Sequence, residues 1–379
     1  MRGKIKGIAM IMVMILTVVL AVPVSAISDE EVAAPSAILI EPKTGKILYE
    51  KNANEVRPCA SITKVMTLLL VMEAIDSGKI SMGDQVAASA HAASMGGSDI
   101  WLKEGEVMSV NDLIKATVIM SANDAAVVLA EHVYGTEDEF VKQMNIRAKQ
   151  LGMNDTTFKN CNGLDEDGHL TTAHDVALMS AALIQHEKIF DYTLTWIDYL
   201  RDGETQLVNT NKLIRSYKGI TGLKTGTTSQ AGSCISATAT RDKLSLVAVV
   251  LGCATTDERF ASASTLLDYG FANFSFTALS MPEFAAVPVY NGLESEVQAE
   301  CGTQAEVLVP KGKESSIQSQ VELSEGVEAP VEQGQLLGKV KYTLDGELLA
   351  EYDITAKTPI NKIGFGAVFM ILFKSLFCW

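Results

Sequence analysis

The stretch PCASITKVMTLLLVM at residues 58–72 places a lysine at the start of an almost wholly apolar run. In VMTLLLVM, which follows the lysine, only the threonine is polar, so a helix here is expected to be buried on every side. Lysine is rarely buried without a partner, and Ser61 lies one helical turn from Lys64. Either Ser61 caps the helix while Lys64 reaches water, or the pair is a serine nucleophile activated by a desolvated lysine.

Residues 1–26 have the layout of a secretory signal peptide. Three basic residues precede the apolar run Ile8–Ala21, and Val24-Ser25-Ala26 provides a small-residue cleavage site. An uncleaved signal anchor is the alternative for this segment. The layout predicts an exported protein whose mature chain starts near residue 27.

The mature chain is strongly acidic. Without residues 1–26 it has 28 Lys and Arg against 46 Asp and Glu, a net charge of −18. Such acidity argues against nucleic acid as a partner and against electrostatic docking on anionic lipid. A mature length of about 350 residues suggests two domains with enough core to fold without disulfides.

The six cysteines do not indicate a metal site, because neither a C-x-x-C pair nor a His-rich cluster occurs. Nothing else in the sequence implies a metal or an organic cofactor. Residues 233–251 are predicted to form a hairpin with Cys234 opposite about residue 249, which leaves Cys253 roughly 13 Å along the strand. That separation is beyond bridging distance, so we expect mostly buried thiols.

Strand patterns occur near both ends of residues 27–278, and helical patterns lie between them. A strand–turn–strand signal spans Ala37–Lys51, and the hairpin spans Ser233–Leu251. This order predicts an α+β domain whose sheet joins the two chain ends. The segments with helical periodicity are Ile62–Ser77, Val110–Met120, Asp124–Tyr134, Thr136–Gln150, Ala173–Gln185 and Asp257–Ala272.

From about Met281 the pattern changes to short β-like runs separated by Gly, Pro and charged turns, which predicts a small all-β domain. The predicted organisation has four parts: a signal peptide (1–26), a first domain (27–278), an all-β domain (281–357) and a tail (360–379).

Two further short motifs lie between Ser61 and the predicted hairpin. One is Lys224-Thr225-Gly226, and the other is Ser-x-Asn, which occurs at residues 109–111 and 121–123. Ser109 precedes an apolar periodic run and has an aspartate three residues on, so we expect it to be a helix N-cap. Ser121 lies in a break between two helices, where polar side chains can project into a cleft. We therefore select Ser121 and Asn123.

Ser-x-x-Lys, Ser-x-Asn and Lys-Thr-Gly in this order form the motif set of penicillin-binding proteins and class A β-lactamases. Nearly the whole mature chain resembles the low-molecular-mass serine-type D-alanyl-D-alanine carboxypeptidases. This resemblance implies a β-lactamase/DD-peptidase-like antiparallel sheet with helices, then that family's C-terminal β domain and membrane anchor. The segments that carry it are ASITKVMTLLLVMEA, GGSDIWLKEGE, MSANDAAVVLAE, NCNGLDEDGHLTTAHDVALMS, GLKTGTTSQAGSC and DERFASASTLLDYGF.

The activity that the resemblance implies is removal of the terminal D-alanine from peptidoglycan stem peptides through an acyl-serine intermediate, with covalent inhibition by β-lactams. Ser61 would be the nucleophile and Lys64 its base, if burial and the positive charge of Lys224 lower the pKa of Lys64. Lys224 would also relay a proton through Ser121 to the leaving amine. The resemblance assigns the oxyanion to backbone N–H groups of Ser61 and Thr227.

Four other residues are predicted to bind substrate. Asn123 is suited to hold the substrate amide, and Gly226 leaves room for a peptide along the strand edge. Thr225 by its motif and Arg259 by its place in DERF fit a free substrate carboxylate. Ordinary alternatives are a surface ion pair for Arg259 and a plain strand residue for Thr225.

Alternative functions stay open at this point. Endopeptidase action on cross-links is a variant of the same chemistry. A β-lactamase would need a deacylating carboxylate such as Asp165 or Glu166, although NGLD at 162–165 resembles the carboxypeptidase loop. A β-lactam sensor is usually tethered to transmembrane signalling helices, and none is evident in the sequence.

The histidines at positions 132, 169 and 174 (His132, His169, His174) are predicted to be structural or exposed, because a Ser–Lys pair needs no triad histidine.

The tail Ile363–Trp379 is predicted to hold the exported protein at the outer face of the cytoplasmic membrane. As a helix its residues reach only about 25 Å, which is less than the roughly 30 Å hydrocarbon core of a bilayer. A buried core helix is the alternative, but a complete β domain would leave it nothing to pack against. We expect shallow or interfacial insertion, with Trp379 at headgroup level.

Overall fold

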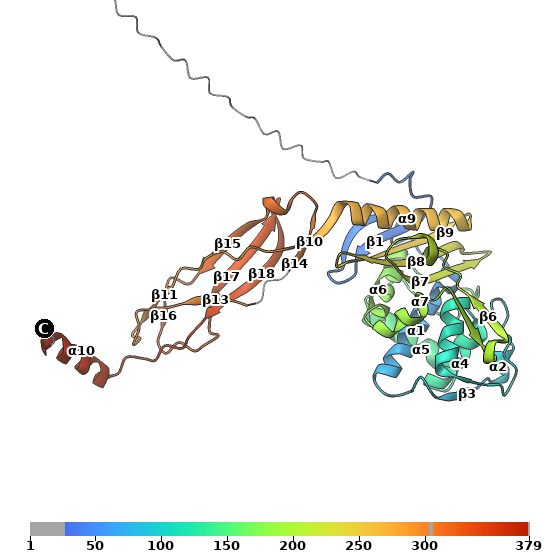
Figure 1. The fold of residues 1–379 in the computed structure, drawn as a ribbon, viewed down its shortest axis with the longest axis horizontal. Coiled ribbons are helices and arrows are strands. Elements are labelled where there is room, and N and C mark those ends of the chain that lie inside the picture. The colour runs from blue at the N-terminus through green and yellow to red at the C-terminus, as the bar shows by residue number, and fades with distance from the viewer. Residues whose placement is uncertain (1–26, 303–305, 378–379) are drawn as a thin grey trace, which may run out of the picture. The chain divides into compact units, whose positions relative to one another are not determined.

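The computed structural model describes residues 27–302 and 306–377, which form two compact units that divide near residue 276 (Figure 1). The predicted signal peptide, residues 1–26, lies outside the described residues. Residues 27–276 contain every predicted catalytic and substrate-binding residue, and residues 277–377 contain most of the short strands.

The first unit is built on a five-stranded antiparallel sheet of order β2-β1-β9-β8-β7. The strands at the start of the chain therefore pair with a strand near the end of the unit, and the predicted joining of the two chain ends is confirmed. The strands are β1 (Ser36–Glu41), β2 (Lys46–Lys51), β7 (Ile220–Thr228), β8 (Gly232–Arg241) and β9 (Leu244–Cys253).

The predicted long helices are present, with ends that differ by a few residues. The predicted helix from Ile62 begins as a 3₁₀ turn, η1 (Ala60–Thr63), and the predicted helix from Val110 ends in a π-helical turn, η2 (Ala116–Met120). The other helices used below are α1 (Lys64–Asp76), α3 (Val110–Lys115), α4 (Asn123–Tyr134), α5 (Glu137–Gln150), α6 (Ala173–Leu183) and α9 (Thr256–Asn273).

Helices cover both faces of the sheet (Figure 1). Side chains alternate along β1, so Ile38 and Ile40 lie in the core that includes α1 and α6, while Leu39 faces the other way. On that other face α9 packs closely: a Cβ at Gly270 would lie 2.5 Å from Leu246 and 3.0 Å from Leu39. Helices thus bury the sheet on both sides, and strand β7 is held in place as a member of this buried sheet.

Several short elements carry no strong periodicity and were not predicted. They are α2 (Ala90–Ala93), α7 (Phe190–Thr193), α8 (Leu213–Ser216), and the strand pairs β3 (Gln85–Ala87) with β4 (Val107–Ser109) and β5 (Ile197–Leu200) with β6 (Thr205–Val208).

The predicted separation of Cys234 from Cys253 is wrong. A β-bulge between Ser233 and Ile235 shifts the hairpin register, so Ser233 lies opposite Cys253. The N–H of Gly252 accordingly donates to the Cys234 sulfur at 3.4 Å. The prediction of thiols is confirmed for the described cysteines, which are all free; four are buried and one is half-buried.

The second unit consists of small sheets with two hydrophobic clusters, as expected for an all-β domain. Its core reaches beyond residue 357, because Ile360 is buried and pairs with Val331. The strands are β11 (Val287–Tyr290), β12 (Glu296–Val297), β13 (Ala299–Cys301), β14 (Glu306–Pro310), β15 (Gln318–Leu323), β16 (Val327–Glu328), β17 (Leu336–Leu344) and β18 (Glu347–Ala356).

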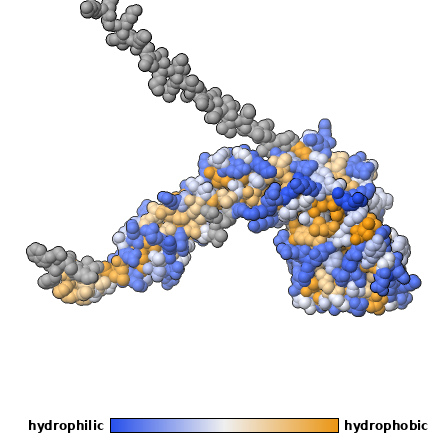
Figure 2. Space-filling model, viewed as in Figure 1, coloured by the Kyte–Doolittle hydropathy of each residue, from blue (hydrophilic) through white to orange (hydrophobic). Residues whose placement is uncertain are grey.

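The tail forms a helix, α10 (Phe365–Phe377). Figure 2 shows a hydrophobic surface on this helix. The exposed large apolar side chains there include Phe365, Val368, Phe369 and Met370. Within the described ranges of the chain, no helix combines the length and apolarity needed to span a bilayer.

Candidate active site

Ser61 and Lys64 lie at the junction of η1 and α1, where the turn of the chain brings their side chains together. Lys64 is 0 % exposed, which excludes the alternative in which it reaches water. Its Nζ donates to Ser61 Oγ at 3.2 Å, to Asn123 Oδ1 at 2.6 Å and to the carbonyl of Asn162 at 2.6 Å. The buried ammonium thus has three oxygen partners, one of them the predicted nucleophile.

Burial lowers the pKa of Lys64 to about 7, although the negative charges of Asp99 and Asp124 oppose the shift. At a pH near this pKa a substantial fraction of the lysine is neutral and can accept a proton, whereas an exposed lysine is almost entirely protonated there. The apolar helix therefore creates a base.

Ser121 ends the π-helical turn η2 in the left-handed conformation, with φ of 66°. Its hydroxyl is buried and has no hydrogen-bond partner, so it is available to a bound molecule. The other Ser-x-Asn serine, Ser109, caps α3 by accepting from the N–H of Asp112 at 3.1 Å, as predicted. Asn123 donates from Nδ2 to the carbonyl of Gly96 at 2.6 Å, which turns its Oδ1 toward Lys64.

Lys224 lies on β7 and is also buried, with Nζ donating to the carbonyl of Thr225 at 3.0 Å. Burial holds its pKa well below the usual value, and the charges of Lys64 and Arg259 lower it further. Burial, one of the two predicted causes, is the largest influence on the pKa of Lys64, and the charge of Lys64 in turn lowers the pKa of Lys224.

Strand β7 packs directly against the turn that carries Ser61. A Cβ at Gly226 would lie 2.9 Å from the backbone N of Ser61 and 2.9 Å from the carbonyl oxygen of Cys59. Glycine is therefore needed here so that two backbone segments can approach closely. These contacts lie in the Cβ direction of Gly226, whereas β7 is the last strand of the sheet, so binding of a peptide along its edge stays a prediction.

The predicted carboxylate readers have different surroundings. Thr225 Oγ1 donates to Thr210 Oγ1 at 2.7 Å, so Thr210 is a neighbour that the sequence did not reveal. The guanidinium of Arg259 is buried and donates to Thr227 Oγ1 at 3.0 Å and to the carbonyl of Gly226 at 3.1 Å. The surface ion pair proposed as the alternative for Arg259 is therefore wrong.

The loop that follows α5 contributes a residue that sequence analysis missed. The carbonyl of Asn162 contacts Lys64, and a backbone group has no signature in side-chain patterns. In the same loop Asp165 accepts a hydrogen bond from Thr228 Oγ1 at 2.6 Å, beyond the end of the Lys-Thr-Gly motif.

His169 is buried against η1, the turn that contains Ser61. Its Nδ1 accepts from the N–H of Lys159 at 3.1 Å, so Nε2 carries the proton and contacts Thr63 Oγ1 at 2.8 Å. Burial lowers its pKa to about 4, which keeps the ring neutral, as suits a structural histidine. Across the described part of the chain, no group of three or more His, Cys, Asp or Glu could hold a metal ion.

The sequence is similar to a known protein family and to individual members of it. Residues 23–255 match the family described as "D-alanyl-D-alanine carboxypeptidase", and residues 282–362 match "Penicillin-binding protein 5, C-terminal domain". D-alanyl-D-alanine carboxypeptidase DacF of Bacillus subtilis (strain 168) is 43% identical over 338 residues, which cover 88% of this chain and 87% of that protein.

Solved structures share the fold. Penicillin binding protein 5 from Haemophilus influenzae superposes with a TM-score of 0.77 at 30% identity, over 89% of this chain and 100% of that chain. Penicillin-Binding Protein D2 from Listeria monocytogenes, in an ampicillin-bound form, has a TM-score of 0.58 at 36% identity, over 63% and 98% of the two chains. This chain therefore belongs to the D-alanyl-D-alanine carboxypeptidase family.

Proposed function

We propose that this chain is a serine-type D-Ala-D-Ala carboxypeptidase in which Ser61 is the nucleophile and Lys64 is its base. The observation that carries the proposal is the contact of Lys64 Nζ with Ser61 Oγ at 3.2 Å, made by a lysine that is wholly buried. A serine hydroxyl is a weak nucleophile until a neighbouring base takes its proton. Burial supplies that base.

The acylation step follows from this assignment. Neutral Lys64 takes the hydroxyl proton, and Ser61 Oγ bonds to the carbonyl carbon of the penultimate D-alanine. The carbonyl electron pair moves onto its oxygen, which we assign to the N–H groups of Ser61 and Thr227. When the C–N bond breaks, the leaving amine of D-alanine takes the proton held by Lys64, with Ser121 and Lys224 as the relay.

Hydrolysis of the acyl-enzyme completes the reaction. A water molecule attacks the ester carbonyl and its proton passes to the base. The bond to Ser61 Oγ then breaks, the base returns the proton to that oxygen, and the shortened stem peptide is released. A β-lactam would acylate the same serine. The ampicillin-bound form of the Listeria relative supports this second reaction.

Substrate recognition is assigned to the residues around β7. Asn123, held by its Nδ2, would orient the substrate amide. The Thr225 hydroxyl would bind the terminal carboxylate. The positive charge of Arg259, which lies behind Thr227, would add electrostatic attraction for it.

We further propose export and attachment to the outer face of the cytoplasmic membrane. The signal-peptide pattern of residues 1–26 supports export, and the exposed apolar side chains of α10 support attachment. The helix has 13 residues, which favours shallow insertion over a full span.

The function is tested with a diacetylated Lys-D-Ala-D-Ala peptide, a cross-linked muropeptide dimer and labelled penicillin. A carboxypeptidase releases D-alanine from the peptide and forms an acyl-enzyme that decays slowly. Preferred cleavage of the dimer would make the chain an endopeptidase. Rapid penicillin hydrolysis without release of D-alanine would make it a β-lactamase, and a lasting label without peptide turnover would make it a sensor.

A further inference from the structure

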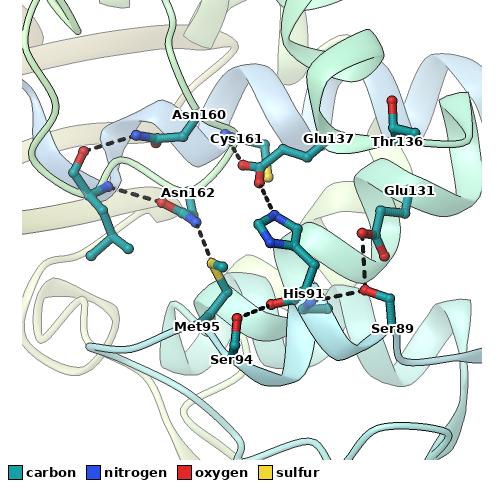
Figure 3. A network of polar contacts seen from close by, with 12 residues as sticks. Ser89, His91, Ser94, Met95, Glu131, Thr136, Glu137, Asn160, Cys161 and Asn162 are labelled. Carbon is teal, nitrogen blue, oxygen red and sulfur yellow. Dashed lines mark hydrogen bonds and ion pairs between the residues drawn. The ribbon is translucent and has the colours of Figure 1, made fainter.

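Glu137 is the first residue of α5 and is not part of the three sequence motifs. Each of its two carboxylate oxygens has a polar contact. Its side chain is 13 % exposed. Oε1 accepts from the backbone N–H of Cys161 at 3.0 Å, and Oε2 lies 2.7 Å from His91 Nε2. Figure 3 shows the carboxylate between the His91 ring and the Cys161 backbone. It therefore connects α2 to the loop after α5.

The peptide groups around Cys161 are held from two helices. Glu137 binds the N–H from α5, and Thr67 Oγ1 on α1 donates to the Cys161 carbonyl at 2.5 Å. The next carbonyl in the chain, that of Asn162, accepts from Lys64 Nζ at 2.6 Å. The residue that Glu137 holds, Cys161, is thus directly followed by the residue that contacts Lys64, Asn162.

The segment that follows His91 contacts Asn162 and Asn123, two of the three residues that accept a hydrogen bond from Lys64. Asn162 Nδ2 donates to Met95 Sδ at 3.5 Å, and the carbonyl of Gly96 accepts from Asn123 Nδ2 at 2.6 Å. The His91–Glu137 contact therefore joins α2 to the loop near Asn162 (Figure 3), and the segment after α2 also holds Asn123.

The loop also lies against the nucleophile turn, so a small movement of it would reach the reacting atoms. A Cβ at Gly163 would lie 2.0 Å from the carbonyl oxygen of Ala60 and 2.9 Å from the backbone N of Ser61. Displacements of about 1 Å in a catalytic geometry cost on the order of a hundredfold in rate.

We propose that Glu137 is a positioning residue for catalysis: by holding the Cys161 N–H, it holds the Asn162 carbonyl on Lys64 and so keeps Nζ beside Ser61 Oγ. This inference rests on the proposed roles of Ser61 and Lys64 in the carboxypeptidase reaction. It adds a residue outside the three motifs to the residues on which the reaction depends.

Loss of this hold should affect Lys64 in two ways. Nζ would be less well aligned with Ser61, which slows acylation. A carbonyl acceptor stabilises an ammonium more than an amine, so weakening the Asn162 contact lowers the pKa of Lys64. Burial raises the pKa of the facing Cys161 thiol and keeps it neutral. The other ionisable groups around Lys64, which are Asp99, Asp124 and Lys224 with Arg259 beside it, stay in place.

A role in capping α5 would not explain these contacts. The N-cap is Thr136, which accepts from the N–H of Glu139, and Glu139 supplies another negative charge in the first turn. Glu139 is bonded to Lys142 and Gln143, away from the Cys161 loop. It therefore provides a matched control for the loss of an acidic residue at this helix end.

The test measures the rate of acylation by labelled penicillin against pH for wild type and for Glu137→Ala, Glu137→Gln and Glu139→Ala. Glu137→Ala should slow acylation by about 10- to 100-fold, and the midpoint of its acidic limb should move to lower pH. Glu137→Gln keeps an oxygen that can accept from the Cys161 N–H, and should restore most of the rate and the midpoint. Glu139→Ala should behave as wild type.

Three results would overturn the proposal: wild-type rate and midpoint in Glu137→Ala, an equal loss in Glu137→Gln, or an equal loss in Glu139→Ala. If Glu137→Ala does not fold, Thr67→Val and Thr67→Ser address the carbonyl of the same residue, Cys161, from α1. Thr67→Val should then shift the midpoint as described, Thr67→Ser should not, and a wild-type profile in Thr67→Val would contradict the proposal. Labelling of Ser61 in wild type separates failure of this inference from failure of the proposed function.

Discussion

The amine of Lys64 lies 3.2 Å from the hydroxyl of Ser61, and no part of the Lys64 side chain reaches solvent. The two residues are separated by one turn, in which a 3₁₀ segment passes into helix α1. The apolar sequence after Lys64 buries the amine, and the partners from α4 and the Asn162 loop orient it. The pair thus depends on tertiary contacts as much as on its three-residue spacing.

The first prediction concerns the pH dependence of acylation. Burial lowers the pKa of Lys64 to about 7, so the lysine is protonated and inactive as a base below this pH. The acylation rate should therefore rise through about pH 7 as the proton is lost. Lys64→Arg keeps a charge that cannot be lost, so acylation should fall by about a hundredfold or more at alkaline pH, where wild-type Lys64 is neutral, and the rise with pH should disappear. Near wild-type acylation in Lys64→Arg would make the lysine structural.

The second prediction separates activity from stability at Ser121. Its hydroxyl is buried without a hydrogen-bond partner, so Ser121→Ala removes an unsatisfied polar group. The melting temperature should stay the same or rise, while peptide turnover falls by about a hundredfold or more because the proton relay is lost. Thermal unfolding and D-alanine release measure the two effects. A fall in melting temperature together with full activity would assign the hydroxyl to the fold.

The third prediction concerns Arg259, which should contribute both to the stability of the fold and to binding of the substrate carboxylate. Arg259→Ala leaves the buried carbonyl of Gly226 without one donor, so the free energy of unfolding should fall by about 1–3 kcal/mol. Turnover of a peptide with a free C-terminus should fall more than acylation by a neutral ester. Arg241→Ala, near the β8–β9 turn, serves as the matched control. Equal losses on both substrates would limit Arg259 to supporting the fold.

The fourth prediction concerns the tail. Ile360 belongs to the core of the second unit and the N–H of Ile363 donates to Asn291, so the chain should be ended after Gly364. The truncated protein should no longer pellet with membranes and should keep its peptidase activity in solution. Phe369→Glu, at an exposed position of α10, should weaken pelleting in the full chain. Undiminished pelleting of the truncated protein would contradict the anchoring role.

Much of the fold could be predicted from the sequence, because the hydrophobic period of a long segment distinguishes a helix from a strand. The predicted strand–turn–strand over Ala37–Lys51 corresponds to β1 and β2, and helices α4, α5 and α9 start within one residue of their predicted starts. The hairpin register could not be predicted, because the bulge at Ser233 depends on packing that a linear pattern does not contain. Short elements such as α2 carry too few residues for a periodic signal.

The candidate site was predictable to the extent that it consists of motif side chains. The structure brings Ser61, Lys64 and Asn123 into contact as the motifs suggest. The Asn162 carbonyl was missed because a backbone acceptor leaves no trace in the residue type. Gly226 was identified from its motif, but its close approach to Ser61 was not predicted, since that approach is a consequence of how β7 packs on η1.

The most direct test of the account is covalent labelling of Ser61. Wild type and Ser61→Ala are incubated with labelled penicillin and with diacetylated Lys-D-Ala-D-Ala, and the labelled peptide is identified by mass spectrometry. We predict that wild type carries the label on Ser61 and releases D-alanine, while Ser61→Ala folds normally and does neither. Undiminished labelling or D-alanine release in Ser61→Ala would contradict the assignment of the nucleophile, and the mechanism with it.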